Sequence, residues 1–255
     1  MKRPSRAPTL PAGNVVKNRL ASVIRSLAEK KRCDLERLKE GQKHWSRHDF
    51  IWHSLLGSFS TMGNARGAEL MRDNELYSRV SWEAISRVPR RTRLKTLCRT
   101  LSEAKVRMAE KKAAWLNSNF ERIREAGGPE AIKRQLEDSS GCEGKIVFLR
   151  SFKGIGPKYA RNIMMDVYHP DFRNSVAVDA RINMVSQALG LAFESYEEEE
   201  DFYCSVAHAA EVQPWELDRL IWNFQDEVMN ALGHSRKDRK AACQEAGRDD
   251  IRAPK

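Results

Sequence analysis

Apolar residues recur every three or four positions along most of the sequence, for example at Val16, Leu20, Ile24 and Leu27. This spacing puts them on one face of an α-helix. Alternating β-branched stretches bounded by turns, which would indicate strands, are missing. The pattern therefore predicts an all-α fold, and a length of 255 residues suits one large domain or two lobes that share a cleft.

Local signals predict where individual helices begin and end. Asp49 is placed to cap a largely apolar core helix, "DFIWHSLLGSFSTMG", which ends at Gly63. Ser81 is placed to open a shorter helix, "SWEAISRVP", which stops at the residue before Pro89.

The chain is strongly basic, with a formal net charge of +10. Such a charge favours a polyanionic partner, because phosphates attract Lys and Arg by steering and by counterion release. Nucleic acid, a ribosome and a membrane surface are each a polyanionic partner of this kind. Residues 87–112 hold ten Lys or Arg and two Glu, and the N-terminal helix is also basic. Each of these stretches is either a contact to a duplex backbone or a solvated helix face.

No apolar run is long enough to span a bilayer, and the N-terminus lacks the apolar core of a secretory signal. We therefore expect an intracellular protein, in the cytoplasm or nucleoid, or in a nucleus. The five cysteines are scattered and form no zinc or iron–sulfur ligand pattern, which predicts free thiols in a reducing compartment.

The stretch 151–183, "SFKGIGPKYARNIMMDVYHPDFRNSVAVDARIN", carries the most specific signal. A Gly-x-Gly turn ahead of a helix exposes backbone N–H groups at the positive end of the helix dipole. A phosphate oxygen can reach those donors where no Cβ blocks the approach, as at Gly154 and Gly156. Ile155 is placed to enter the core, and Pro157 suits the first helical position.

Lys158 and Asp179 each have two readings. Lys158 falls in the first helical turn, where the dipole disfavours a cation, which suits an amine that attacks as a neutral nucleophile. A lysine at this position is equally consistent with a residue that binds DNA and has no catalytic role. Asp179 precedes "ARIN" as a helix N-cap, a role worth about 1 kcal/mol, or it serves chemistry together with the turn.

The two motifs together resemble the helix-hairpin-helix and Gly/Pro-Asp loop of the HhH-GPD superfamily of base-excision DNA glycosylases. The matching pieces are "FKGIGPKYA" at 152–160 and "AVDAR" at 177–181. The resemblance covers residues 49–232, with the hairpin at 144–167 and the Asp loop at 174–181. It leaves a basic N-terminal extension at 1–48, partly helical, and a polar tail at 233–255.

The resemblance implies a two-lobed all-α enzyme that extrudes a damaged nucleotide from double-stranded DNA. Lys153, Gly154, Ile155 and Gly156 would hold the DNA backbone. Family members with Lys at the position of Lys158 attack the sugar C1′, form a Schiff base and cleave the strand, which predicts AP-lyase activity.

The resemblance also assigns Asp179, which would stabilise positive charge on the sugar and accept a proton from the nucleophile. The acidic run at 197–201 should lie away from DNA. We expect a monomer with no metal and no iron–sulfur cluster, because the family's cysteine quartet is missing. The resemblance also allows a monovalent cation at the hairpin.

This sequence departs from its relatives at several places. Phe59 stands where pyrimidine-specific members often carry Gln, so it either lines the base pocket or, as we favour, packs in the core. Arg181 replaces the usual His after the loop Asp and either reaches a phosphate or faces solvent. Trp222 and Phe224 could stack on a flipped base, although their helical spacing favours core packing.

Three functions stay open on the sequence alone. The leading one is a bifunctional glycosylase for an oxidised base, with 8-oxoguanine as the first choice. The others are a monofunctional glycosylase of the same fold, in which Lys158 contacts a phosphate, and a non-catalytic helix-hairpin-helix DNA-binding protein.

Overall fold

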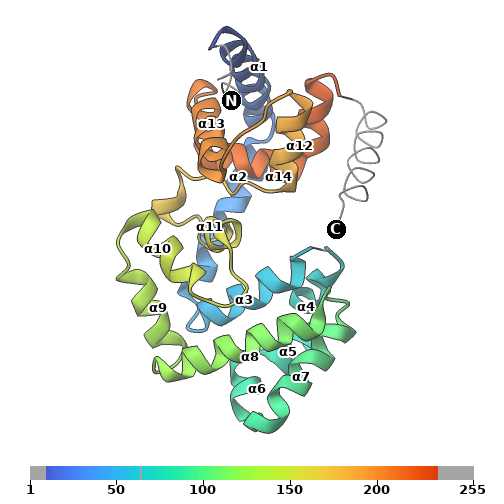
Figure 1. Ribbon diagram of the computed structural model, residues 1–255, viewed down its shortest axis with the longest axis vertical. Coiled ribbons are helices and arrows are strands. Elements are labelled where there is room, and N and C mark those ends of the chain that lie inside the picture. Colours follow the sequence, from blue (N-terminus) through green and yellow to red (C-terminus); the bar gives the residue numbers. More distant parts are fainter. Residues whose placement is uncertain (1–9, 64, 235–255) are drawn as a thin grey trace, which may run out of the picture. The chain divides into compact units, whose positions relative to one another are not determined.

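The computed structural model describes residues 10–63 and 65–234 (Figure 1). Every regular element in these ranges is a helix, so the prediction of an all-α fold is confirmed. The chain divides into two compact units, at Lys39/Glu40 and again at Phe172/Arg173. We call residues 40–172 the hairpin unit and the remaining described residues the Asp-loop unit.

The hairpin unit is one continuous piece of chain. Its helices are η1 (Glu40–Ser46), α3 (Phe50–Thr61), η2 (Ala65–Ala68), α4 (Glu69–Arg72), α5 (Asn74–Val80), α6 (Trp82–Arg87), α7 (Arg90–Glu103), α8 (Ala109–Glu125), α9 (Pro129–Glu137), α10 (Gly141–Arg150), α11 (Pro157–Met165) and η3 (Pro170–Phe172). Helices α7 and α8 pack along each other (Figure 1).

Helix α3 is the centre of the hairpin unit, as its apolar sequence predicts. Trp52 and Leu56 are fully buried there, and α8, α9 and α11 pack against the helix. Its C-terminus is held by Lys112, whose Nζ donates to the carbonyls of Phe59 at 2.8 Å and Met62 at 2.7 Å. A cation suits the negative end of the helix dipole. Burial, with Arg107 nearby, lowers the pKa of Lys112 to about 8.

The Asp-loop unit joins the N-terminal and C-terminal parts of the chain. It contains α1 (Leu10–Lys30), α2 (Arg32–Lys39), α12 (Ala180–Ala188), α13 (Tyr196–Ala209) and α14 (Pro214–Ala231). Helix α1 packs on α13 and α14 through the apolar stripe that the sequence predicts, with Leu20 and Ile24 fully buried.

Two cations of α1 hold the ends of its neighbours. Arg25 donates to the carbonyls of Ala209 and Ala210 at the end of α13, and Arg19 donates to the carbonyl of Leu232 at the end of α14. The structure thus groups residues 10–39 with the C-terminal helices, where the sequence suggested a separate extension at 1–48. The expected tail at 233–255 lies outside the described residues from position 235 onward.

The predicted caps have mixed outcomes. The Ser81 hydroxyl accepts from the Ala84 amide at the start of α6, as expected. Asp49 stands at the N-cap of α3, but its side chain makes no cap bond. Arg47 instead donates to both of its carboxylate oxygens, at 2.8 and 3.0 Å. A charged partner two residues away competes successfully for a carboxylate that a cap would otherwise use.

None of the described helices combines the length and the apolar character needed to cross a bilayer.

Candidate active site

Helices α10 and α11 and the turn between them form the predicted helix-hairpin-helix. Gly154 has a φ of +86°, a left-handed conformation that L side chains rarely adopt, and Ile155 is buried at 6% exposure. Pro157 occupies the first turn of α11, where its missing N–H costs no hydrogen bond. The sequence correctly predicted the burial of Ile155 and the position of Pro157. The glycine at 154 is required by its left-handed φ and by the close approach of Trp115 and Phe59.

The hairpin rests on α3 and α8. The Asn119 side chain accepts from the amide of Lys153 at 2.9 Å and donates to its carbonyl at 3.0 Å, so one buried residue fixes the start of the turn. Phe59 and Trp115 lie beneath Gly154 with their ring centroids 5.7 Å apart. Phe59 is 1% exposed, so the structure places it in the core and not in a base pocket.

Two hairpin amides point away from the protein's own acceptors. In the part of the chain that the structure describes, the N–H groups of Gly154 and Gly156 donate to no backbone or side-chain oxygen. No atom lies within 4 Å of the place where a Cβ at Gly156 would stand. The turn therefore offers donors that an external oxyanion can approach.

The two glycines should respond differently to alanine. A Cβ at Gly154 would stand 2.5 Å from Trp115, at a φ that disfavours it, so Gly154→Ala should cost about 2–4 kcal/mol of unfolding free energy. Gly156 has a φ of −96° and open space, so Gly156→Ala should fold normally. Thermal denaturation of both variants checks this; equal losses of stability would contradict it.

Lys158 lies in the first turn of α11, half-buried, as expected. Its Nζ stands 4.6 Å from the centre of the Tyr159 ring. The face of α11 that begins here continues one turn later with Asn162, because residues four apart lie above one another on a helix. Tyr159 and Asn162 both line a cavity of about 170 Å³. Tyr159 therefore links the two, because its ring lies near the Lys158 amine and also lines the cavity, whereas Lys158 itself is not a lining residue.

Three carbonyl oxygens at the start of the hairpin turn accept hydrogen bonds within the protein. Those of Ser151 and Lys153 accept from the Arg122 and Asn119 side chains, and that of Phe152 accepts from the Ile155 amide. A monovalent cation at the hairpin would need carbonyl oxygens of this kind as ligands, and its presence stays a prediction.

Asp179 begins α12 as predicted. Its carboxylate accepts from the amides of Arg181 at 2.8 Å and Ile182 at 3.2 Å. Both bonds end on Oδ1, so the cap engages one oxygen of the two. The capping role is present in the structure. A catalytic role for the same carboxylate stays a prediction.

Residues that the sequence analysis missed hold the Asp loop in place. The buried Asp218 of α14 accepts from the Ala177 amide at 2.8 Å. The Tyr196 hydroxyl accepts from the Val178 amide at 3.0 Å, and Glu200 accepts from the Val176 amide at 3.2 Å. Part of the acidic run at 197–201 is therefore internal support for the loop. Only its position in space reveals this, because none of these partners is near the loop in sequence.

Arg181 and Trp222 form a pair at the exposed edge of the Asp-loop unit. The guanidinium lies 4.3 Å from the centre of the indole ring, and it also donates to the Trp222 carbonyl. Trp222 is 43% exposed, so the expectation of core packing was wrong for it. Through the Arg181 amide, this exposed aromatic ring is connected to Asp179.

Phe224 marks a break in α14. Its φ of −125° and ψ of 32° are non-helical, and Lys31 lies 4.2 Å above its ring. Phe224 itself is half-buried. The residues on either side of the kink no longer share one helical face.

The candidate residues thus fall into two local sets. The hairpin unit carries Lys153, Gly154, Gly156 and Lys158, while the Asp-loop unit carries Asp179 with Arg181 and Trp222. Their convergence on one sugar stays a prediction.

The basic stretch 87–112 is largely open to solvent. Two of its ten cations, Arg93 and Lys112, are buried in structural roles. The other eight are exposed: Arg87, Arg90, Arg91, Lys95, Arg99, Lys105, Arg107 and Lys111. Exposed cations on one run of chain are compatible with contacts to a phosphate backbone.

No family model matches the sequence, and no curated protein sequence matches it significantly. Three solved structures share its fold. The 8-oxoguanine DNA glycosylase of Thermotoga maritima is 16% identical, with a TM-score of 0.61 over 81% of this chain and 95% of its own.

The 8-oxoguanine DNA glycosylase of Methanocaldococcus jannaschii is 18% identical, with a TM-score of 0.63 over 81% and 93%. The 8-oxoguanine glycosylase/lyase of the same organism, in complex with a 15mer DNA that contains 8-oxoguanine, is 17% identical, with a TM-score of 0.62 over 80% and 95%. The chain therefore has the fold of HhH-GPD DNA glycosylases, as its motifs predicted.

Proposed function

We propose that this protein is a base-excision DNA glycosylase with AP-lyase activity, and that its substrate is an oxidised base, 8-oxoguanine first of all, in double-stranded DNA. The observation that carries this proposal is a lysine in the first turn of the hairpin helix, within a fold shared with three 8-oxoguanine glycosylase structures. One of those proteins is a glycosylase/lyase.

The hairpin would hold the DNA. The amides of Gly154 and Gly156 donate to one phosphate, which fixes the register without reading sequence. The nucleotide rotates out of the stack, because the glycosidic bond is inaccessible inside it.

Lys158 supplies the nucleophile. Its neutral amine attacks C1′ of the sugar, the bond from C1′ to the base breaks, and the base leaves with the electron pair and gains a proton. Loss of a proton from nitrogen and opening of the sugar ring give a Schiff base. Removal of a C2′ proton then expels the 3′ phosphate by β-elimination, which cuts the strand.

Asp179 supplies charge. Its carboxylate stabilises the positive charge that develops on the sugar as the base leaves, and it accepts a proton from the amine. The cap through Oδ1 orients the group, and Asp218 with Tyr196 holds the loop that carries it.

One observation favours a second candidate, a non-catalytic DNA-binding protein. The Asp179 side chain makes two good cap bonds, which is a sufficient structural reason for an Asp at this position.

A nicking assay separates the candidates. A duplex with a single 8-oxoguanine is incubated with excess protein, and the strands are analysed with and without hot alkali. We expect nicks without alkali. Nicks that appear only after alkali would indicate a monofunctional glycosylase. If no nicks form at any lesion in a panel of single-lesion duplexes, the protein binds DNA without excising a base.

A further inference from the structure

The hairpin unit contains a cavity of mixed polar and apolar lining, and one of its lining residues, Tyr159, has its ring centre 4.6 Å from the Lys158 Nζ. Its lining comes from η1, α3 and α11 and includes His44, His53, Thr61, Tyr159 and Asn162. Its volume of about 170 Å³ exceeds the roughly 150 Å³ that holds a benzene-sized ring in a protein interior. The cavity is therefore large enough to hold one edge of a heteroaromatic base.

His53 is a polar group of this cavity, and the structure holds it with a hydrogen bond from outside the lining. Its Nδ1 lies 2.9 Å from the Tyr77 hydroxyl. Burial is the main reason that the pKa of His53 falls to about 4, with Arg47 adding to the effect. Asp49 acts in the opposite direction, and His44, stacked on the ring, adds a small lowering. The ring is therefore neutral at pH 7 and carries one hydrogen.

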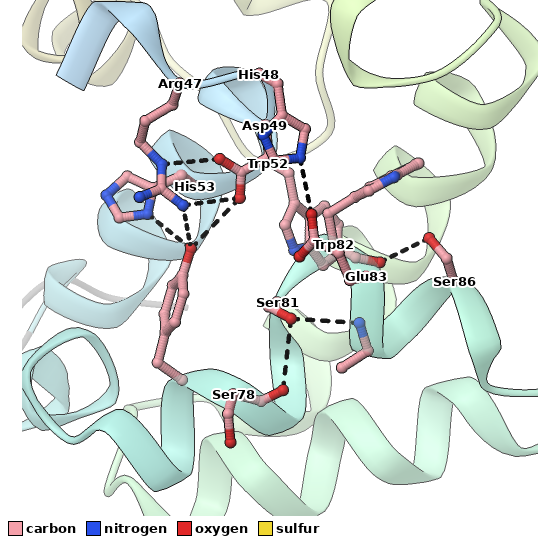
Figure 2. Close-up of polar contacts among 12 residues, drawn as sticks. Arg47, His48, Asp49, Trp52, His53, Ser78, Ser81, Trp82, Glu83 and Ser86 are labelled. Carbon is pink, nitrogen blue, oxygen red and sulfur yellow. Dashed lines mark hydrogen bonds and ion pairs between the residues drawn. The ribbon is translucent and has the colours of Figure 1, made fainter.

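An ion pair behind the cavity orients Tyr77. Figure 2 shows Arg47, Asp49 and His53 gathered around the end of one tyrosine side chain. Arg47 donates to the Tyr77 oxygen at 3.0 Å, while Asp49, whose oxygens already accept from Arg47, stands 3.5 Å away.

These distances decide where the tyrosine hydrogen goes. An O–H···O bond of 3.5 Å is far longer than the usual 2.7–2.8 Å, whereas 2.9 Å to a ring nitrogen is a normal bond. Tyr77 therefore donates to Nδ1 of His53. In a neutral ring the hydrogen must then sit on Nε2. In the described part of the chain, Nε2 has no hydrogen-bond partner of its own.

We propose that His53 is a specificity-determining residue, whose Nε2–H donates to a carbonyl oxygen of the extruded base in this cavity. The inference rests on the proposed function, because only an extruded base would enter there. An oxidised purine such as 8-oxoguanine presents carbonyl oxygens on both rings, so it supplies the acceptor. Tyr77, Arg47 and Asp49 are positioning residues, which act by fixing the tautomer of His53.

Three variants of His53 and its surroundings test the assignment. His53→Leu removes the donor, and His53→Gln restores an N–H at about the distance of Nε2. His48→Gln is the matched control, since His48 is an exposed histidine of the same unit that pairs with Glu83 outside the cavity. Thermal denaturation verifies that each variant is folded.

Two substrates distinguish a specific loss of base recognition from a general loss of function in the variant proteins. Single-turnover excision is measured on a duplex with 8-oxoguanine, and affinity on a duplex with a tetrahydrofuran abasic site, which has no base. We expect His53→Leu to slow excision by about 10- to 100-fold, because it leaves the base oxygen without its donor. We expect His53→Gln to recover most of the rate, His48→Gln to match the wild type, and all affinities for the abasic duplex to agree within twofold.

The tautomer is measured directly in the wild-type protein by ring-nitrogen NMR at pH 7. The hydrogen should be on Nε2, and Tyr77→Phe should mix the two tautomers. A hydrogen on Nδ1, undiminished excision by His53→Leu, or equal loss of affinity for the abasic duplex would each overturn the proposal. Absence of any excision by the wild type would instead contradict the proposed function and remove this role with it.

Discussion

Lys158→Gln should abolish strand cleavage without alkali and should remove the covalent complex that borohydride traps with the lesion duplex. Glutamine is one atom shorter than lysine and stays polar, but it has no nucleophilic amine, so no Schiff base can form. Loss of a covalent nucleophile reduces turnover by roughly 10³-fold or more. Gel electrophoresis of end-labelled duplex with and without borohydride measures both effects.

A second lysine of the hairpin provides the control. Lys153 is exposed, five residues before Lys158, and its backbone is clamped by Asn119. Lys153→Gln should weaken DNA binding, as expected for a phosphate contact, and still give the trapped complex. Undiminished trapping by Lys158→Gln would assign the nucleophile elsewhere.

Asp179→Asn should slow base release by about 10²- to 10⁴-fold while duplex affinity remains nearly unchanged. Asparagine caps helices about as well as aspartate, so this variant removes the charge and retains the cap. Single-turnover excision and equilibrium binding to the abasic duplex give the two quantities.

The matched control for Asp179→Asn is Asp73→Asn. Asp73 caps α5 with the same two-amide pattern, to Glu75 and Leu76. That substitution should leave the excision rate unchanged. A fall in duplex affinity with Asp179→Asn as large as the fall in rate would identify Asp179 as a structural cap and support the non-catalytic reading.

Features that depend on neighbouring residues could be predicted from the sequence. The hairpin turn, the first helical turn at Pro157 and the cap by Ser81 follow from the conformational limits of Gly and Pro and from the reach of a short side chain. The helical stripe of α1 followed from spacing alone. These features also place Lys158 and Asp179 on the elements that the motif requires.

Features that depend on residues far apart in sequence could not be predicted. The support of the hairpin by Asn119 spans 34 residues, and that of the Asp loop by Asp218 spans 41. Tyr77 and His53 are 24 residues apart. The exposure of Trp222 was missed for a related reason, because spacing within α14 does not show which parts of the helix other elements cover.

The central claim concerns a single covalent bond, and peptide mapping of that bond tests it most directly. The wild-type protein would be reduced with borohydride on an 8-oxoguanine duplex, digested with protease and nuclease, and sequenced by mass spectrometry. We predict that the sugar remnant is attached to the side chain of Lys158. A remnant on any other residue, or no adduct from a protein that binds the duplex, would contradict the account.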